Sequence, residues 1–323
     1  MEPVLLYLPF LQQPVTLYGI LSVVCIIAAL VLSFLTAKRL NKKSHMAVFA
    51  LLSLVLGAFI GRLFYSLVRS DFLFYDELGE YAGLLPFFNF AAGSLNMGGI
   101  LLGILLAAVL SSKLTKEKTA NLLDAAVLPV LCLYAGMRLI EPLSGQGFGE
   151  LIEQPFLCFY PIATCNAWDE WMLSVCSIEA ILAIAVLVVL LINRSKIQRT
   201  GSLYLYAMAL FAPSQMFFEL FRQDDVLYIF VFASISLLCL VTCMVLSQFA
   251  LLHRAYKETL PKGTALREAG LMLLGVIVCV GGVFALDKTN LPDVMVYAVI
   301  ILALVLMSVL FCRRIAMEDK RAA

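Results

Sequence analysis

Charge is scarce in this chain: only 14% of its 323 residues are Asp, Glu, Lys or Arg, whereas 63% are hydrophobic. The net charge is +1, and basic residues interleaved with aromatic ones do not gather in a patch, so we expect no nucleic-acid partner. Clusters of metal-ligating residues are also lacking, and we expect neither a metal nor a cofactor. A soluble domain of this size does not need so much apolar sequence. The composition therefore predicts an all-α, polytopic integral membrane helix bundle.

The N-terminus lacks the basic segment that precedes the apolar core of a cleaved signal peptide, so we expect the first apolar run to remain as a membrane span. Seven of the nine cysteines lie in apolar segments, where we interpret them as small core residues. Cys158 and Cys165 instead share one connection. We expect them to form a disulfide if this connection faces an oxidising compartment; two free thiols are the alternative.

Apolar runs of spanning length predict nine membrane helices, because a backbone in lipid must satisfy its own hydrogen bonds. The runs lie near residues 15–37, 46–68, 89–112, 120–141, 172–193, 201–221, 227–252, 269–286 and 293–312. Eighteen of the 23 Lys and Arg residues fall in alternate connections and at the C-terminus. Since basic connections are retained in the cytoplasm, we predict an outside N-terminus and a cytoplasmic C-terminus.

Five basic residues depart from this distribution; Arg69 and Lys288 lie in outer connections, and the other three are arginines. Arg62, Arg138 and Arg222 lie in, or at the outer ends of, three alternate helices. Guanidinium groups bind phosphate through paired hydrogen bonds, so three of them at one depth indicate a shared anionic ligand. The alternative is that each one reaches the lipid headgroups or pairs with a carboxylate.

Carboxylates lie at the same depth as these arginines. Glu141 follows Arg138 by three residues, and Glu219 precedes Arg222 by three, so each pair shares one helix face. Glu179 lies inside the fifth apolar run. The sequence therefore predicts that acids and arginines share one polar site within the membrane.

Two further patterns bear on this site. Gly98, Gly99 and Gly103 remove side chains along one side of the third predicted helix, which permits close approach of another backbone or of a ligand. The outer connections 71–88 and 143–171 are acidic and aromatic. We interpret them as an interfacial aromatic belt with solvated acids; a lid over the site is the alternative.

Several motifs, taken in order, resemble those of the bacterial prolipoprotein diacylglyceryl transferase family. They are YGI at Tyr18, GAFIGRLFYSL around Arg62, GSLNMGGILLG at 93–103, AGMRLIEPLSGQG at 135–147, the helix with Glu179, and FELFRQDD at 218–225. The resemblance covers about residues 14–252, and six motifs in register make it specific. We expect residues 1–252 to form a family-like seven-helix domain and residues 253–323 to add two helices.

The resemblance implies transfer of a diacylglyceryl group from phosphatidylglycerol, or a similar anionic phospholipid, to the lipobox cysteine of a prolipoprotein in the bacterial plasma membrane. It implies catalytic roles for Arg138, Glu219, Arg222 and Glu141. It also implies substrate-binding roles for Tyr18, Arg62, Met97, Gly98, Gly99, Gln146, Glu179 and Gln215. The arginines would hold the phosphate, and the substrate thiol would be the nucleophile.

The chain departs from the family at four of these positions: Met97 replaces a histidine, Glu141 an asparagine, Gln146 a glutamate and Gln215 an arginine. The only histidines, His45 and His253, are predicted on the cytoplasmic side. We therefore expect a carboxylate to act as the base. Two other functions remain open: a catalytically impaired lipid- or lipoprotein-binding membrane protein that keeps the fold, and a small-anion transporter, for which no inverted repeat is visible.

Overall fold

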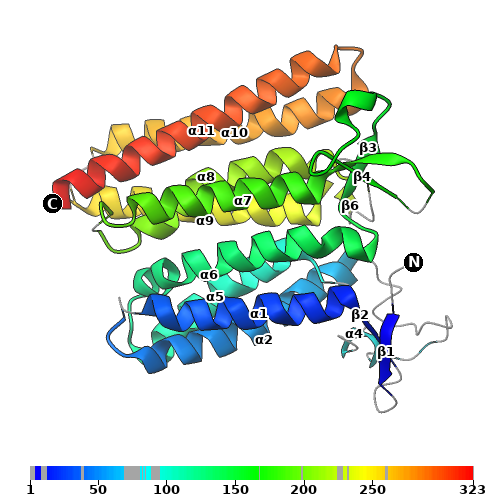
Figure 1. Cartoon of the computed structure of the whole chain (residues 1–323). Helices are drawn as coiled ribbons and strands as arrows, with labels where there is room; N and C mark the ends of the chain where they lie inside the picture. Colours follow the sequence, from blue (N-terminus) through cyan, green and yellow to red (C-terminus); the bar gives the residue numbers. More distant parts are fainter. Residues whose placement is uncertain are drawn as a thin grey trace.

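Nine helices of at least 18 residues run side by side through the described part of the chain, with short β-strands at one end of the bundle (Figure 1). The computed structural model describes residues 4–8, 13–37, 40–68, 81, 83, 85–88, 95–166, 168–197, 199–223, 228–230, 233–258 and 261–322. The long helices are α1 (Leu17–Thr36), α2 (Lys43–Val68), α5 (Met97–Thr115), α6 (Thr119–Ile140), α7 (Val175–Asn193), α8 (Ser202–Glu219), α9 (Ile235–Glu258), α10 (Lys262–Lys288) and α11 (Asp293–Ala322). The predicted all-α membrane bundle is confirmed.

Eight of these helices are long and apolar enough to cross a membrane, which makes the chain a multi-pass membrane protein. Among the long helices of the described residues, α8 does not meet this criterion, although we predicted a membrane span at residues 201–221. It carries Gln215 and Glu219 in its last two turns, and α7, α9 and α11 pack around it. Because these neighbours enclose α8, its polar side chains face protein.

Two predicted helix starts are wrong or displaced. The helix predicted from residue 89 begins at Met97. Asn96 caps it, because the Asn96 side-chain oxygen accepts a hydrogen bond from the Gly99 N–H at 2.9 Å. Residues 89–94 of the predicted run lie outside the described residues. The run predicted from residue 227 begins with an antiparallel pair, β6 (Tyr228–Phe230) and β7 (Ala233–Ser234). The helix starts only at Ile235 because the Ser234 hydroxyl oxygen accepts from the Leu237 N–H at 3.1 Å and so caps α9.

The connection 143–171 folds into a small antiparallel sheet at the end of α6 and α7 (Figure 1). Its order is β3–β5–β4, with β3 at Phe148–Leu151, β4 at Ala163–Cys165 and β5 at Trp171–Ser174. At the N-terminus, β1 (Val4–Leu8) pairs with β2 (Gln13–Thr16). The predicted disulfide is wrong, because Cys158 and Cys165 are both free thiols. The Cys158 thiol instead donates to the Gln154 carbonyl at 3.4 Å.

Glycines set how closely α5 approaches its neighbours. A Cβ on Gly99 would lie 2.9 Å from the Gly61 Cα of α2, and a Cβ on Gly98 would lie 2.7 Å from the Cys239 Cβ of α9. A larger residue at either place would push two helices apart. Of the two alternatives drawn from the sequence, tight helix packing therefore accounts for both glycines.

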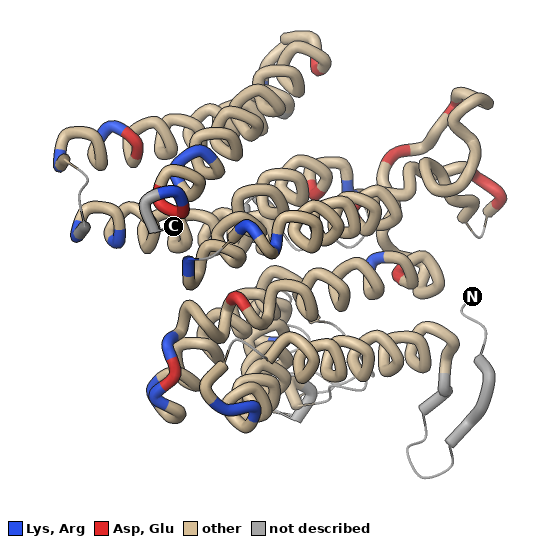
Figure 2. The backbone as a smooth tube through the Cα atoms, turned by 60° about the vertical axis from the view of Figure 1, so that its left-hand side comes forward, with Lys and Arg blue, Asp and Glu red and all other residues tan. Residues whose placement is uncertain are grey.

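Most Lys and Arg residues gather at the end of the bundle opposite the sheet (Figure 2). There Glu117 joins the α1–α2 turn to the α5–α6 turn. Its carboxylate accepts from the Asn41 N–H at 3.1 Å and the Asn121 side chain at 2.7 Å, and it pairs with His45 Nδ1 at 3.1 Å. Burial raises the pKa of this carboxyl, but these bonds and one from the Lys118 backbone outweigh burial and lower the pKa to about 2.

We expect Glu117→Gln to lower thermal stability at pH 7. The folded-state pKa of Glu117 is depressed, so its stabilisation is present above about pH 4.5 and is lost as the pH falls toward 2. Melting temperatures of the purified protein in detergent, measured from pH 7 to pH 3, should therefore converge for wild type and variant. Glu153→Gln, an exposed acid, is the control. A difference that stays constant across this pH range would contradict the assignment.

Candidate polar site within the bundle

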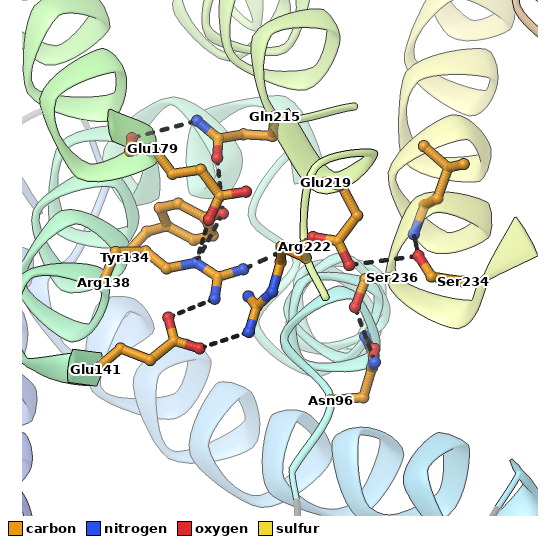
Figure 3. A network of polar contacts seen from close by, with 12 residues as sticks. Asn96, Tyr134, Arg138, Glu141, Glu179, Gln215, Glu219, Arg222, Ser234 and Ser236 are labelled. Carbon is orange, nitrogen blue, oxygen red and sulfur yellow. Dashed lines mark hydrogen bonds and ion pairs between the residues drawn. The ribbon is translucent and has the colours of Figure 1, made fainter. Parts of the chain in front are cut away.

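Arg138, in the last turn of α6, is the centre of a buried polar network (Figure 3). Its side chain is 6% exposed, and three glutamates from three different elements surround it. Nη1 pairs with a carboxylate oxygen of Glu141, Nε lies 2.9 Å from Glu179 Oε2, and Nη2 lies 4.0 Å from Glu219 Oε2. Arg138 thus links α6 to α7 and α8 through ion pairs in the buried interior of the protein.

Glu141 bridges the two arginines of the site. One carboxylate oxygen accepts from Arg138 and the other from Arg222 Nη2 at 2.8 Å. Glu141 occupies this place because it opens η3 (Glu141–Ser144), a 3₁₀ turn that continues α6 and ends at Gly145 with φ +74°. A single carboxylate therefore receives one charge-assisted hydrogen bond from each of two guanidinium groups, so the two arginines together hold one anion.

Arg222 reaches this carboxylate from outside the helix in which we predicted it. The α8 helix ends at Glu219, and the next residues form a turn in which the Arg222 N–H donates to the Glu219 carbonyl at 3.4 Å. The prediction that Glu219 and Arg222 share a face of one helix is therefore wrong. The turn places the Arg222 guanidinium toward η3 instead (Figure 3).

Tyr134 links the arginine to Gln215, and the sequence analysis missed it. Its hydroxyl accepts from Arg138 Nε at 3.1 Å and donates to Gln215 Oε1 at 2.8 Å. Gln215 Nε2 in turn donates to the Glu179 backbone carbonyl at 3.4 Å. The signal was available, because Tyr134 precedes Arg138 by one helical turn and so lies on the same face. The guanidinium carbon also lies 5.2 Å from the Tyr134 ring centre.

Glu179 is held differently from the other two acids. It is fully buried, and neither of its carboxylate oxygens accepts a hydrogen bond from a described residue; the Arg138 guanidinium neutralises it through the ion pair alone. Glu219, by contrast, accepts from the Ser234 hydroxyl at 3.3 Å. Glu179 is therefore the carboxylate of the three that can take up a proton without giving up a hydrogen bond.

The charges of the described network do not balance. Two arginines face three glutamates, which leaves one negative charge in excess when every group is ionised. An uncompensated charge is expensive inside a protein. One proton taken up by a carboxylate makes the cluster neutral. The site is thus suited both to holding an anion between two arginines and to accepting a proton.

The structure does not bring every predicted residue into this network. Arg62 is 1% exposed, and its Nε donates to the Phe87 carbonyl at 3.2 Å, which ties α2 to α4 (Leu85–Phe88). Gln146 is exposed in the turn after η3. Tyr18 lies in the first turn of α1, and its carbonyl accepts from the Ser22 hydroxyl. The predicted ligand shared by three arginines therefore reduces to Arg138 and Arg222 among the described contacts.

An apolar cavity lies beside the network, between α1, α2, α5 and α6. Its volume is about 230 Å³, and apart from two serines its lining is apolar. Met97 and Met137 line it, and Met137 directly precedes Arg138. Met97, the predicted replacement for a histidine, thus belongs to an apolar wall. The cavity suits a hydrocarbon chain rather than a polar ligand.

Most of this bundle is similar to one known protein family. The family model described as prolipoprotein diacylglyceryl transferase matches residues 3–253, which run from β1 into α9. It therefore covers all of the site residues described above. No curated protein sequence matches the chain. The helices α10 and α11 lie beyond the matched residues.

Proposed function

Because this chain belongs to the prolipoprotein diacylglyceryl transferase family, we propose that it transfers a diacylglyceryl group from phosphatidylglycerol to the lipobox cysteine of prolipoproteins. The observation that carries the proposal is a pair of arginines, Arg138 buried and Arg222 partly buried, joined by one carboxylate beside an apolar cavity. An anionic headgroup and a hydrocarbon tail need these two environments next to each other.

The site lies at the end of α6 and α8 that adjoins the small sheet (Figure 1), and most Lys and Arg residues gather at the opposite end of the bundle (Figure 2). Since basic connections stay in the cytoplasm, the end with the site faces outward, with the C-terminus inside. The protein then spans the bacterial plasma membrane with its polar network at the depth of the outer leaflet. A phospholipid and the lipobox segment of a translocated prolipoprotein both reach the site from that side.

The phosphate takes the place of the Glu141 carboxylate between the two guanidinium groups. Each Glu141 oxygen already accepts one hydrogen bond from one arginine, as the two non-bridging oxygens of a phosphodiester would. One acyl chain then enters the apolar cavity past Met137 and Met97. The lipid is held so that the glyceryl carbon bonded to the phosphate oxygen faces the incoming thiol.

In the reaction, the cysteine sulfur attacks that glyceryl carbon. A carbon–sulfur bond forms, the carbon–oxygen bond to the phosphate breaks, and glycerol phosphate leaves with the electron pair. Arg138 and Arg222 stabilise the charge that develops on the departing phosphate. The thiol proton passes to Glu179, the carboxylate that accepts no hydrogen bond from a described residue.

The alternative is a lipid- or lipoprotein-binding protein without catalysis. It is favoured by Met97, which lines an apolar wall where the family resemblance places a histidine. Transfer and binding differ in their products. Only transfer releases glycerol phosphate in amounts equal to the modified peptide.

The proposal is tested with purified protein in vesicles and a lipobox peptide. We expect glycerol phosphate to be released from vesicles that contain phosphatidylglycerol. With vesicles of phosphatidylcholine alone we expect the peptide to stay unmodified, since that headgroup is zwitterionic. A peptide with serine in place of the cysteine is the matched control, because it lacks the thiol nucleophile. Release that does not depend on the cysteine would contradict the proposal.

A further inference from the structure

The Arg222 turn is fixed on one side by the small sheet. The Gln223 N–H donates to the Phe148 carbonyl of β3 at 3.0 Å. A Cβ on Gly149 would lie 2.7 Å from the Phe221 carbonyl, so the strand and the turn approach with no room for a side chain. The backbone on either side of Arg222 is therefore held against β3.

The other side of the turn is covered by Tyr297, from the second turn of α11. Its ring stacks on Phe221 with centroids 5.0 Å apart and an angle of 26° between the planes. It also meets the edge of Phe217, at 6.3 Å and 85°. Phe217 and Phe221 contact each other at 5.1 Å. Aromatic rings packed this way attract one another beyond the effect of the area they bury.

The α11 helix is anchored along α8 at both ends. At the end with the basic residues, the Ser202 hydroxyl donates to Asp319 at 2.7 Å, and Arg254 Nη2 of α9 pairs with Glu318 at 2.8 Å. Between the two ends, Ile300 and Leu304 are buried in the same core cluster as residues of α8. Tyr297 is thus carried by a rigid helix and not by a loop.

We infer that Tyr297 is a positioning residue: through its stack on Phe221 it holds the Arg222 guanidinium beside the place that Glu141 occupies, where the phosphate would bind. The contact comes from α11, outside the residues matched by the family model, so an added helix completes a site that the matched region contains. The Arg222 guanidinium can bind phosphate oxygens only if it points in a fixed direction. A displacement of about 1 Å can lower the rate roughly 100-fold. The kinetic side of this inference rests on the proposed function.

The test compares Tyr297→Ala with Tyr297→Phe. The phenylalanine variant keeps the stacked ring and should stay within about twofold of wild type. The alanine variant should raise KM for phosphatidylglycerol about tenfold, because Arg222 is no longer held in line. The control is Tyr256→Ala, which should leave KM unchanged, because Tyr256 is exposed and lies near the C-terminal end of α9. Equal behaviour of the alanine and phenylalanine variants at Tyr297 would overturn the inference.

A second readout does not depend on catalysis. Hydrogen exchange at the amides of residues 220–223 should be faster in Tyr297→Ala than in wild type, while exchange in α1 stays the same. If the wild type transfers no diacylglyceryl group but this exchange pattern is found, the proposed function fails and the positioning role of Tyr297 stands. If exchange at 220–223 is unchanged in the alanine variant, the positioning role fails even when transfer is found.

Discussion

Replacement of either site arginine with glutamine, Arg138→Gln or Arg222→Gln, should lower diacylglyceryl transfer by about 100- to 1,000-fold, the usual effect of removing one preorganised donor to a developing charge. In the proposed reaction, each guanidinium would form a charge-assisted bond that strengthens as the departing phosphate gains charge. Lysine at either position should restore little, because an ammonium group cannot reproduce a planar fork. Initial rates with phosphatidylglycerol vesicles and a lipobox peptide measure both effects.

The two arginines should differ in their effect on stability. Arg138 is 6% exposed and lies among Glu141, Glu179 and Glu219, so its loss leaves buried carboxylates without a counter-charge. Arg138→Gln should therefore lower the melting temperature, whereas Arg222→Gln should lower it less, because Arg222 pairs with Glu141 alone among these three acids in the contacts described. The control is Arg267→Gln, an exposed arginine at the basic end, which should change neither rate nor melting temperature. Full activity in either site variant would contradict the phosphate-binding role.

Glu179→Gln should lower the rate at pH 7 by about 100-fold, the lower end of what a general base contributes. A thiol with a pKa near 8.5 is little ionised at neutral pH, so the variant should regain rate steeply as the pH rises toward 9 and the thiolate forms unaided. The wild-type rate should rise less over the same range. A pH–rate profile of both proteins measures this difference.

The melting temperature distinguishes loss of the proton acceptor from loss of the folded structure. Glutamine has nearly the same shape as glutamate and removes the excess negative charge of the cluster, so Glu179→Gln should melt no lower than wild type. Glu153→Gln, an exposed acid, is the matched control for transfer. A Glu179→Gln variant with the wild-type pH profile would show that another group accepts the proton.

Hydropathy and local spacing predicted a large part of the fold and the site. The nine long helices of the described residues follow from apolar runs, because lipid leaves a backbone few alternatives to the helix. The Arg138–Glu141 pair follows from a spacing of three residues, which places the two side chains on one side of a turn. These are local features, and local features can be read from one sequence.

Contacts between distant segments could not be predicted in this way. The pairing of Glu141 with Arg222 joins residues 81 positions apart, and it depends on where α8 ends. The β3–β5–β4 sheet has strands of three or four residues with a register shift, too short to give a periodic pattern. Tyr297 stacks on Phe221 from a helix that no motif of the site includes. Tertiary packing decides each of these contacts.

The most direct test of the account is the mass of a lipobox peptide after incubation with the purified protein and phosphatidylglycerol. The account predicts a mass increase equal to one diacylglyceryl group on the cysteine, absent from a parallel reaction with Arg222→Gln. An unchanged peptide at every pH from 6 to 9, with phosphatidylglycerol bound to the purified protein, would contradict transfer and leave a lipid-binding protein with the family fold.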